Sequence, residues 1–67
     1  MVTIVLNGKI DELQTSVLIS EYLAQKSINP DHVVVEINRT IINKNDFCSM
    51  KIVEGDNIEI LRFVGGG

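Results

Sequence analysis

The start of the chain decides its fold: residues 1–13 read MVTIVLNGKIDEL. Residues 1–6 are apolar and rich in β-branched side chains, as in a strand, and this run stops at Asn7-Gly8. Asn-Gly is the strongest short-range hairpin signal, because both central residues of a type I′ turn need a positive φ. We therefore expect residues 9–13 to return antiparallel to a first strand.

A helix is predicted next, over residues 18–26. Its apolar side chains lie at helical spacing and form one stripe, made of Leu18, Ile19, Tyr22 and Leu23. Thr15 and Ser16 precede this segment and offer hydroxyl groups that can cap its first turn. The helix cannot continue beyond Asn29, because Pro30 disfavours the α region for the residue before it.

The rest of the chain contains further β-rich runs, at residues 32–37, 40–42 and 58–63. Residues 43–50 are mostly polar and read as an irregular loop. The resulting order, ββαβ(β)β, predicts an α+β fold. We expect a mixed sheet of four to five strands with one helix packed across one face.

Composition narrows the class of protein. The 67 residues allow one domain (residues 1–63) with a glycine tail (64–67), and the 45% hydrophobic content is too high for a disordered acidic chain. The net charge of −3 and the lack of a Lys/Arg cluster argue against nucleic acid as a partner. Apolar runs of at most three residues are too short to span a membrane. A single cysteine excludes an internal disulfide, so the reducing cytoplasm is the expected location.

Residues that could support catalysis are few. His32 is the only histidine and is expected at the surface, without a second ligand or nucleophile to serve. Cys48 has no histidine close in sequence and is expected to be a half-buried structural thiol. The carboxylates are scattered, and no Cys/His spacing supports a metal. We therefore predict no catalytic residue, no metal site, no bound cofactor and no enzymatic activity of the chain alone.

Strand alternation predicts an apolar surface on the sheet face away from the helix. Val5 on the first strand and Leu61 and Phe63 on the last strand point to this face. A contiguous exposed apolar patch usually marks a partner surface. Two alternatives remain open: residues 43–50 fold over the patch, or the strand alternation slips.

The chain ends in Val64-Gly65-Gly66-Gly67 directly after the last strand. Glycines lack a Cβ, so such a tail can enter a narrow channel, and it carries the carboxylate of Gly67 up to about 10 Å beyond Val64. A carboxylate becomes a good electrophile once it is activated, for example as a mixed anhydride with AMP. The alternative is a frayed chain end or a cloning remnant.

These features together resemble the ThiS family of sulfur carriers over essentially the whole chain. The resemblance rests on Asn7-Gly8, Ser16-Val17, VVVEIN at 33–38, EGDNIEI at 54–60 and FVGGG at 63–67. One departure is Asn38-Arg39, where the family often has Asn-Gly. The family fold is the ubiquitin-like β-grasp.

The resemblance implies a function for the tail. An E1-like adenylating enzyme would use ATP and magnesium to adenylate Gly67, with Gly65 and Gly66 as the slender lead-in. Sulfur from a donor such as a cysteine desulfurase would then give a C-terminal thiocarboxylate, which thiazole synthase uses in thiamin biosynthesis. Val5, Leu61 and Phe63 would dock these enzymes. Two alternatives stay open: a carrier for another client such as molybdopterin synthesis, or a non-covalent β-grasp interaction module.

Overall fold

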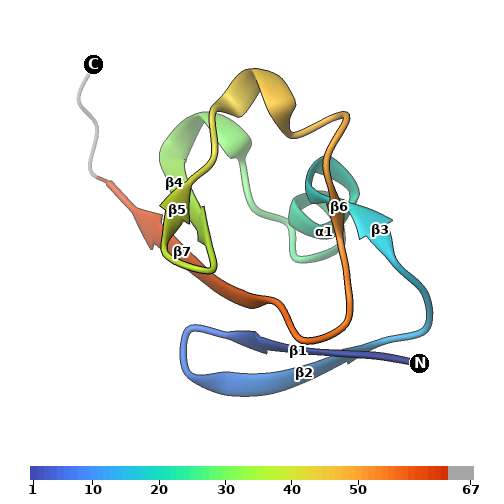
Figure 1. Ribbon diagram of the computed structural model, residues 1–67. Coiled ribbons are helices and arrows are strands. Elements are labelled where there is room, and N and C mark those ends of the chain that lie inside the picture. The colour runs from blue at the N-terminus through green and yellow to red at the C-terminus, as the bar shows by residue number, and fades with distance from the viewer. Residues whose placement is uncertain (64–67) are drawn as a thin grey trace.

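The computed structural model describes residues 1–63, which form a five-stranded main sheet, a two-stranded sheet and one α-helix (Figure 1). The elements are β1 (Val2–Leu6), β2 (Lys9–Leu13), β3 (Val17–Leu18), α1 (Ile19–Gln25), β4 (Val33–Ile37), β5 (Thr40–Ile41), β6 (Lys51–Ile52) and β7 (Asn57–Arg62), with 3-10 turns η1 (Pro30–His32) and η2 (Lys44–Asp46). The main sheet has the order β2-β1-β7-β4-β5. Strands β1 and β7 are parallel and the other pairs are antiparallel.

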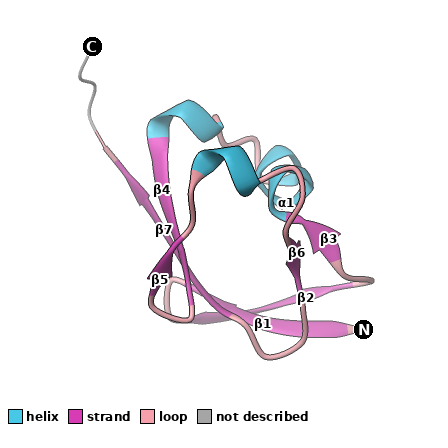
Figure 2. Cartoon of the chain, turned by 45° about the horizontal axis from the view of Figure 1, so that its top comes forward, coloured by secondary structure: helices cyan, strands magenta, loops and turns pink. Residues whose placement is uncertain are grey.

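The predicted fold class is confirmed: the sheet is mixed, and α1 lies on one side of it (Figure 2). The predicted first hairpin is also confirmed. Asn7 and Gly8 have φ values of 49° and 83°, as a type I′ turn requires, and Leu6 pairs directly with Lys9 across the turn. This hairpin fixes the register of β1 against β2 along its whole length.

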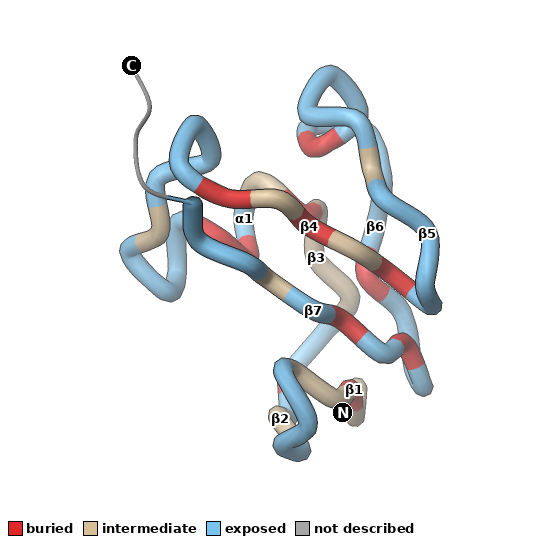
Figure 3. The backbone as a smooth tube through the Cα atoms, turned by 90° about the vertical axis from the view of Figure 1, so that its left-hand side faces the viewer, coloured by how far each residue is buried: buried red, intermediate tan, exposed pale blue. Residues whose placement is uncertain are grey.

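The hydrophobic core lies between α1 and the sheet. Ile19, Tyr22 and Leu23 of the helix are each 1% exposed, which confirms three of the four residues of the predicted stripe; the fourth, Leu18, lies in β3. From the sheet side, Ile4, Val35 and Ile58 are at most 1% exposed. Buried residues alternate with more exposed ones along β4 and β7, so the sheet has one dry face and one open face (Figure 3).

Two local predictions were wrong. The helix does not begin at Leu18 as predicted; Leu18 and Val17 form β3, which pairs with β6. The helix begins at Ile19, and the backbone N–H of Leu18 donates to the Glu21 carboxylate at 2.8 Å. The Ser16 hydroxyl donates to the carbonyl of Ile52 rather than capping the helix, because the β3–β6 pairing brings these residues together.

The segment after β5 is more ordered than expected, and it covers the helix side of the molecule. Its turn η2 is followed by Phe47, which is 3% exposed. Backbone hydrogen bonds join α1 to this segment, from Ile19 to the Met50 carbonyl and from Ser20 to the Phe47 carbonyl, both at 2.9 Å. The segment therefore closes the core from the α1 side.

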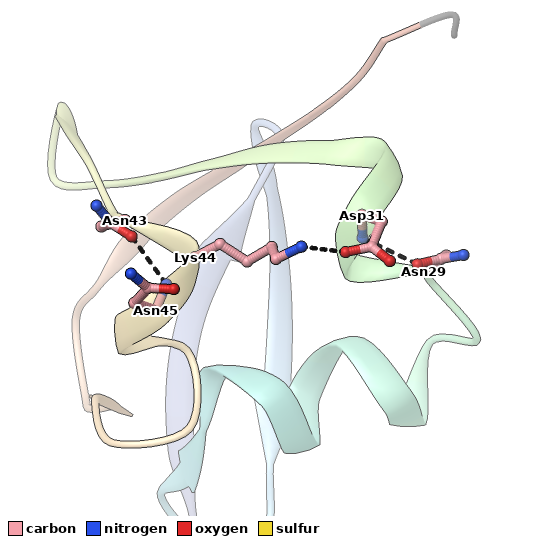
Figure 4. Close-up of polar contacts among 5 residues, drawn as sticks. All are labelled: Asn29, Asp31, Asn43, Lys44 and Asn45. Carbon is pink, nitrogen blue, oxygen red and sulfur yellow. Dashed lines mark hydrogen bonds and ion pairs between the residues drawn. The ribbon is translucent and has the colours of Figure 1, made fainter. Parts of the chain in front are cut away.

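Polar side chains stabilise the two 3-10 turns and connect them (Figure 4). Asn29 caps η1 by accepting from the backbone N–H of Asp31 at 2.9 Å, and Asn43 caps η2 by accepting from Asn45 at 2.8 Å. Lys44 of η2 pairs with the Asp31 carboxylate, and this contact holds the pKa of Asp31 below its ordinary value. Both groups are exposed, so the pair orients the turns more than it stabilises the fold.

The β4–β5 turn has an unusual backbone for its residues. Asn38 and Arg39 have φ values of 52° and 70°, so Arg39 occupies a left-handed position that favours glycine. The Asn38 side chain donates to Asp56 at 3.0 Å and accepts from the N–H of Asn57 at 2.9 Å. Asp56 is 8% exposed and also accepts from the N–H of Val53, so one buried carboxylate joins two turns.

Candidate functional site

The face of the sheet opposite α1 is open and partly apolar, as the strand alternation predicts. Leu61 is 52% exposed and Phe63 is 48% exposed, whereas Ile58 on the opposite face of β7 is fully buried. The alternative that residues 43–50 cover this face is wrong, because Phe47 and Met50 bond to α1 on the other side. The strand alternation does not slip: Val5, which lies opposite Asn57, and Leu61 share the open face.

The register nevertheless separates Val5 from the other two residues. Val5 lies opposite Asn57 on β7, four residues before Leu61. At about 3.3 Å per residue, this places Val5 roughly 13 Å from Leu61 along the strand direction. The structure brings together Leu61, Phe63 and Val34, which lies opposite Leu61 on β4; we call this group the Leu61 cluster.

Val5 has its own apolar neighbour, Ile10, which lies opposite it on β2 and is 76% exposed. We call this pair the Val5 cluster. Ile10 was missed by the sequence reasoning, although the Asn-Gly hairpin was the signal that could have found it. A two-residue turn at 7–8 pairs residue 5 with residue 10 and places both on one face.

Carboxylates lie between and beside the two clusters. Glu59 and Glu36 are directly opposite each other on β7 and β4, and Glu12 lies opposite Thr3 at the far side of the sheet. Among the strand-paired positions of this face within residues 1–63, none is Lys or Arg. Like charges directly opposite in a sheet are unfavourable. The open face therefore combines exposed apolar groups with an acidic strip.

The predicted attachment residue Gly67 and its lead-in residues Gly65 and Gly66 lie outside the described residues. Strand β7 is the last element of the described residues, and Phe63 directly follows it, with its N–H donating to the His32 carbonyl at 3.1 Å. Phe63, the last residue that the structure describes, therefore lies in the Leu61 cluster beside β4.

The residues considered for catalysis lie apart from one another. His32 is exposed, as predicted. Cys48 is also exposed, so the prediction of a half-buried thiol was wrong; it follows η2 in a turn in which the buried residue is Phe47. Within residues 1–63, no group of three His, Cys, Asp or Glu side chains is placed to bind a metal. No helix in the same part of the chain is long and apolar enough to cross a membrane.

A cluster of three titratable side chains, Asp11, Tyr22 and Lys26, lies on the α1 side. The Tyr22 hydroxyl donates to the Asp11 carboxylate at 2.7 Å, and Lys26 approaches the same oxygen at 3.0 Å. The pKa of Asp11 is lowered, mainly by the hydrogen bond from the Tyr22 hydroxyl and to a lesser extent by Lys26. The pKa of Tyr22 is raised, mainly because the hydroxyl is buried and also because it donates to the Asp11 carboxylate. This cluster keeps Tyr22 neutral and fixes the helix against β2, and it offers no nucleophile.

A mixed sheet that wraps one helix, with its first and last strands parallel and adjacent at the centre, is the ubiquitin-like β-grasp fold. A small domain with an exposed apolar face of this kind is typical of proteins that bind other proteins. The chain belongs to the ThiS family, whose model matches residues 4–67.

The relatives agree with this assignment. The sulfur carrier protein ThiS of Bacillus subtilis is 36% identical over 63 residues, covering 92% of this chain and 96% of that protein. The crystal structure of the thiamine biosynthesis protein ThiS from Geobacter metallireducens has a TM-score of 0.82 and 31% identity, covering 97% of this chain and 99% of that one. The thiazole synthase of Paramagnetospirillum magneticum is 30% identical over 64 residues, but the chain, 96% of which is matched, spans only 20% of its length.

Proposed function

We propose that this chain is a sulfur carrier of thiamin biosynthesis and that the carboxylate of Gly67 carries the sulfur. The observation that carries this proposal is the family match, which runs through residue 67 and so includes the glycine tail. The similarity to the Bacillus sulfur carrier over nearly the full length of both chains supports it. The scarcity of catalytic groups in residues 1–63 fits a protein on which other enzymes act.

The proposed chemistry replaces one oxygen of the Gly67 carboxylate with sulfur. An E1-like enzyme, with ATP and magnesium, joins that oxygen to AMP and releases pyrophosphate. The terminal sulfur of an enzyme-bound persulfide, supplied by a cysteine desulfurase, attacks the acyl carbon, and AMP leaves with the oxygen. A thiol then cleaves the sulfur–sulfur bond of the acyl disulfide and releases the thiocarboxylate. ATP and magnesium belong to the activating enzyme.

In this proposal the open face of the sheet docks the enzymes. The Leu61 cluster includes Phe63, only four residues before Gly67, so a partner that holds the tail also comes close to this cluster. The Val5 cluster extends the footprint across the sheet, and the acidic strip at Glu36 and Glu59 favours a partner surface that carries basic side chains. Exposed apolar side chains on an otherwise closed domain are typical of such surfaces.

We assign thiazole synthase as the client that receives the sulfur. Two thiazole synthases contain a region similar to nearly this whole chain, 30% identical in Paramagnetospirillum magneticum and 28% identical in Magnetococcus marinus. A carrier fused to its client keeps the tail at high local concentration, which suits two proteins that must meet for sulfur transfer.

The intact mass of the protein purified from its native cells tests the proposal. A fraction heavier by the difference between a sulfur and an oxygen atom, located at Gly67, is the expected result. If only the carboxylate form is present, the protein is incubated with ATP, magnesium and the adenylating enzyme of the same organism, and pyrophosphate exchange is measured. Absence of both signals would refute the carrier function in favour of a non-covalent module.

Two tail variants test the threaded-tail mechanism. Gly66→Val adds a β-branched side chain and should abolish adenylation, whereas Gly66→Ala adds only a methyl group and should retain part of it. Both should leave the unfolding temperature unchanged, since residues 1–63 contain the core. Equal adenylation rates for wild type and Gly66→Val would contradict the proposal. The client is identified by offering the charged protein to thiazole synthase and to molybdopterin synthase.

A further inference from the structure

One edge of β7 is closed only over part of its length. On one side β4 accompanies β7 from Ile58 to Arg62. On the other side, β1 pairs with only the first two residues of β7: Val5 lies opposite Asn57 and Leu6 lies opposite Ile58. Beyond that point β1 turns away into the hairpin with β2 (Figure 1).

The side chain of Asn7 extends β1 by one further position. Its backbone N–H donates to the Ile58 carbonyl at 2.9 Å, as a strand residue would. Its side-chain amide then accepts from the N–H of Ile60 at 2.8 Å and donates to the Ile60 carbonyl at 3.3 Å. The amide thus replaces the next residue of the strand, and it closes the edge of β7 through Ile60.

Arg62 is the next residue with its backbone directed to this edge. Phe63 donates to His32 on the β4 side, and hydrogen-bonding direction alternates along a strand. The N–H and C=O of Arg62 therefore point away from β4, and no partner for them lies among residues 1–63. An unpaired strand edge is a ready template for another strand.

We propose that the edge of β7 at Arg62 pairs with an extended segment of the adenylating enzyme, which adds a strand to the sheet of the carrier. This inference rests on the proposed function. The four residues from Val64 to Gly67 span at most about 14 Å, so an active site that reaches Gly67 brings the backbone of its enzyme close to this edge. Main-chain pairing also suits a glycine tail, which has no side chains to recognise.

A strand paired at this edge would have different neighbours on the two faces of the sheet. Leu61 and Phe63 point to the open face, whereas Arg62 points to the other side of the sheet and is exposed. The paired segment should therefore contact the Leu61 cluster with apolar side chains and present a carboxylate or a carbonyl group to the guanidinium of Arg62. Main-chain bonds provide affinity in this mode, and the alternating side chains provide register.

A pair of substitutions separates the backbone of residue 62 from its side chain. Arg62→Ala removes the guanidinium and keeps the N–H, whereas Arg62→Pro removes both. Proline is tolerated where the N–H faces an open edge, and the preceding residue is already in the extended conformation that proline requires. ATP–pyrophosphate exchange with the adenylating enzyme of the same organism gives KM and kcat for each variant. We expect the KM of Arg62→Pro to be about tenfold above that of Arg62→Ala, with little change in kcat.

A semisynthetic protein removes the N–H alone and guards against misfolding of the proline variant. Cys48 is exposed and unique, so a synthetic 48–67 segment with an ester in place of the amide N–H of residue 62 can be ligated to residues 1–47. An ester at Glu54 is the matched control, since the N–H of Glu54 also lacks a partner among the described residues. The ester at 62 should raise KM, and the ester at 54 should not.

The outcomes are distinct. If the wild-type chain gives no exchange, the proposed function fails and this inference fails with it. If the wild type is active but the proline and alanine variants have equal KM, and the ester at 62 behaves like the ester at 54, the carrier function holds and the strand pairing is refuted. If light scattering shows a dimer of the wild type that Arg62→Pro abolishes, the edge pairs with a second copy instead, which also refutes the proposal.

Discussion

Replacing Tyr22 with phenylalanine should weaken the fold in a way that depends on pH. The ring of Tyr22 is 1% exposed, so the substitution keeps the packing and removes only the hydroxyl. That hydroxyl donates to the Asp11 carboxylate at 2.7 Å. A hydrogen bond to a charged group contributes about 1.5–3 kcal/mol, and the Asp11 side chain is 25% exposed to water, which favours the lower end. We expect a loss of about 1.5 kcal/mol, or roughly 6–12 °C in Tm for a domain of this size.

The pH dependence follows from the two pKa shifts. The pKa of Asp11 is lowered in the folded state, so its contribution is present above its unfolded pKa of 3.8 and is lost as pH falls through the folded value. The pKa of Tyr22 is raised above 10.0, so its contribution is present below pH 10 and is lost as pH rises further. The stability difference between wild type and Tyr22→Phe should therefore be largest between about pH 5 and pH 9 and shrink at both ends.

Thermal unfolding followed by circular dichroism at pH 3, 7 and 10.5 measures this difference. Asp11→Asn and the double variant complete a cycle, in which the coupling between the two residues should be at least about 1 kcal/mol at pH 7. Lys26→Met serves as a comparison, because its ion pair with Asp11 is more exposed and should contribute less than about 1 kcal/mol. A difference that stays constant from pH 3 to pH 7 would refute the assignment of the hydroxyl to the charged carboxylate.

Two further substitutions test the surface and the turn. Leu61→Asp should cost less than about 1.5 kcal/mol of stability, since this side chain is 52% exposed. The same substitution should raise the KM of adenylation at least tenfold. Met50→Asp is the control that should leave KM unchanged, since Met50 is 40% exposed and lies on the α1 side. Unfolding of Leu61→Asp would show that the face is not free. Arg39→Gly should stabilise the domain by about 0.5–1 kcal/mol, because the φ of 70° at this residue is costly for any side chain, and an unchanged or lower urea midpoint would contradict this.

The elements that local patterns determine were predicted well from the sequence. The hairpin at Asn7-Gly8 and the apolar stripe of the helix depend on neighbours within a few residues, and both were confirmed. The pairing of β3 with β6 was missed because two-residue strands carry no period. It is set by contacts between residues more than thirty positions apart, such as Val17 with Ile52. The exposure of Cys48 was missed for a related reason, since strand alternation does not apply to the turn that follows η2.

The open face shows where the sequence stops being informative. Strand alternation correctly placed Val5, Leu61 and Phe63 on one face, because that property depends only on position within each strand. Their distance from one another depends on the parallel pairing of β1 with β7, whose partners are about fifty residues apart in the chain. No local pattern fixes that register, so one predicted patch proved to be two clusters.

The acidic strip links the energetics of the fold to its function. Opposing Glu36 with Glu59 in a β ladder disfavours the isolated domain, and the pair lies next to apolar side chains that remain in water. Neither the opposed carboxylates nor the exposed apolar side chains stabilise the isolated domain. Under the proposed function, a partner that covers the Leu61 cluster and brings basic groups to the strip would relieve both, so these features would favour the complex over the free domain. The same carboxylates separate the two apolar clusters, and their like charge disfavours contact between the open faces of two copies of this domain.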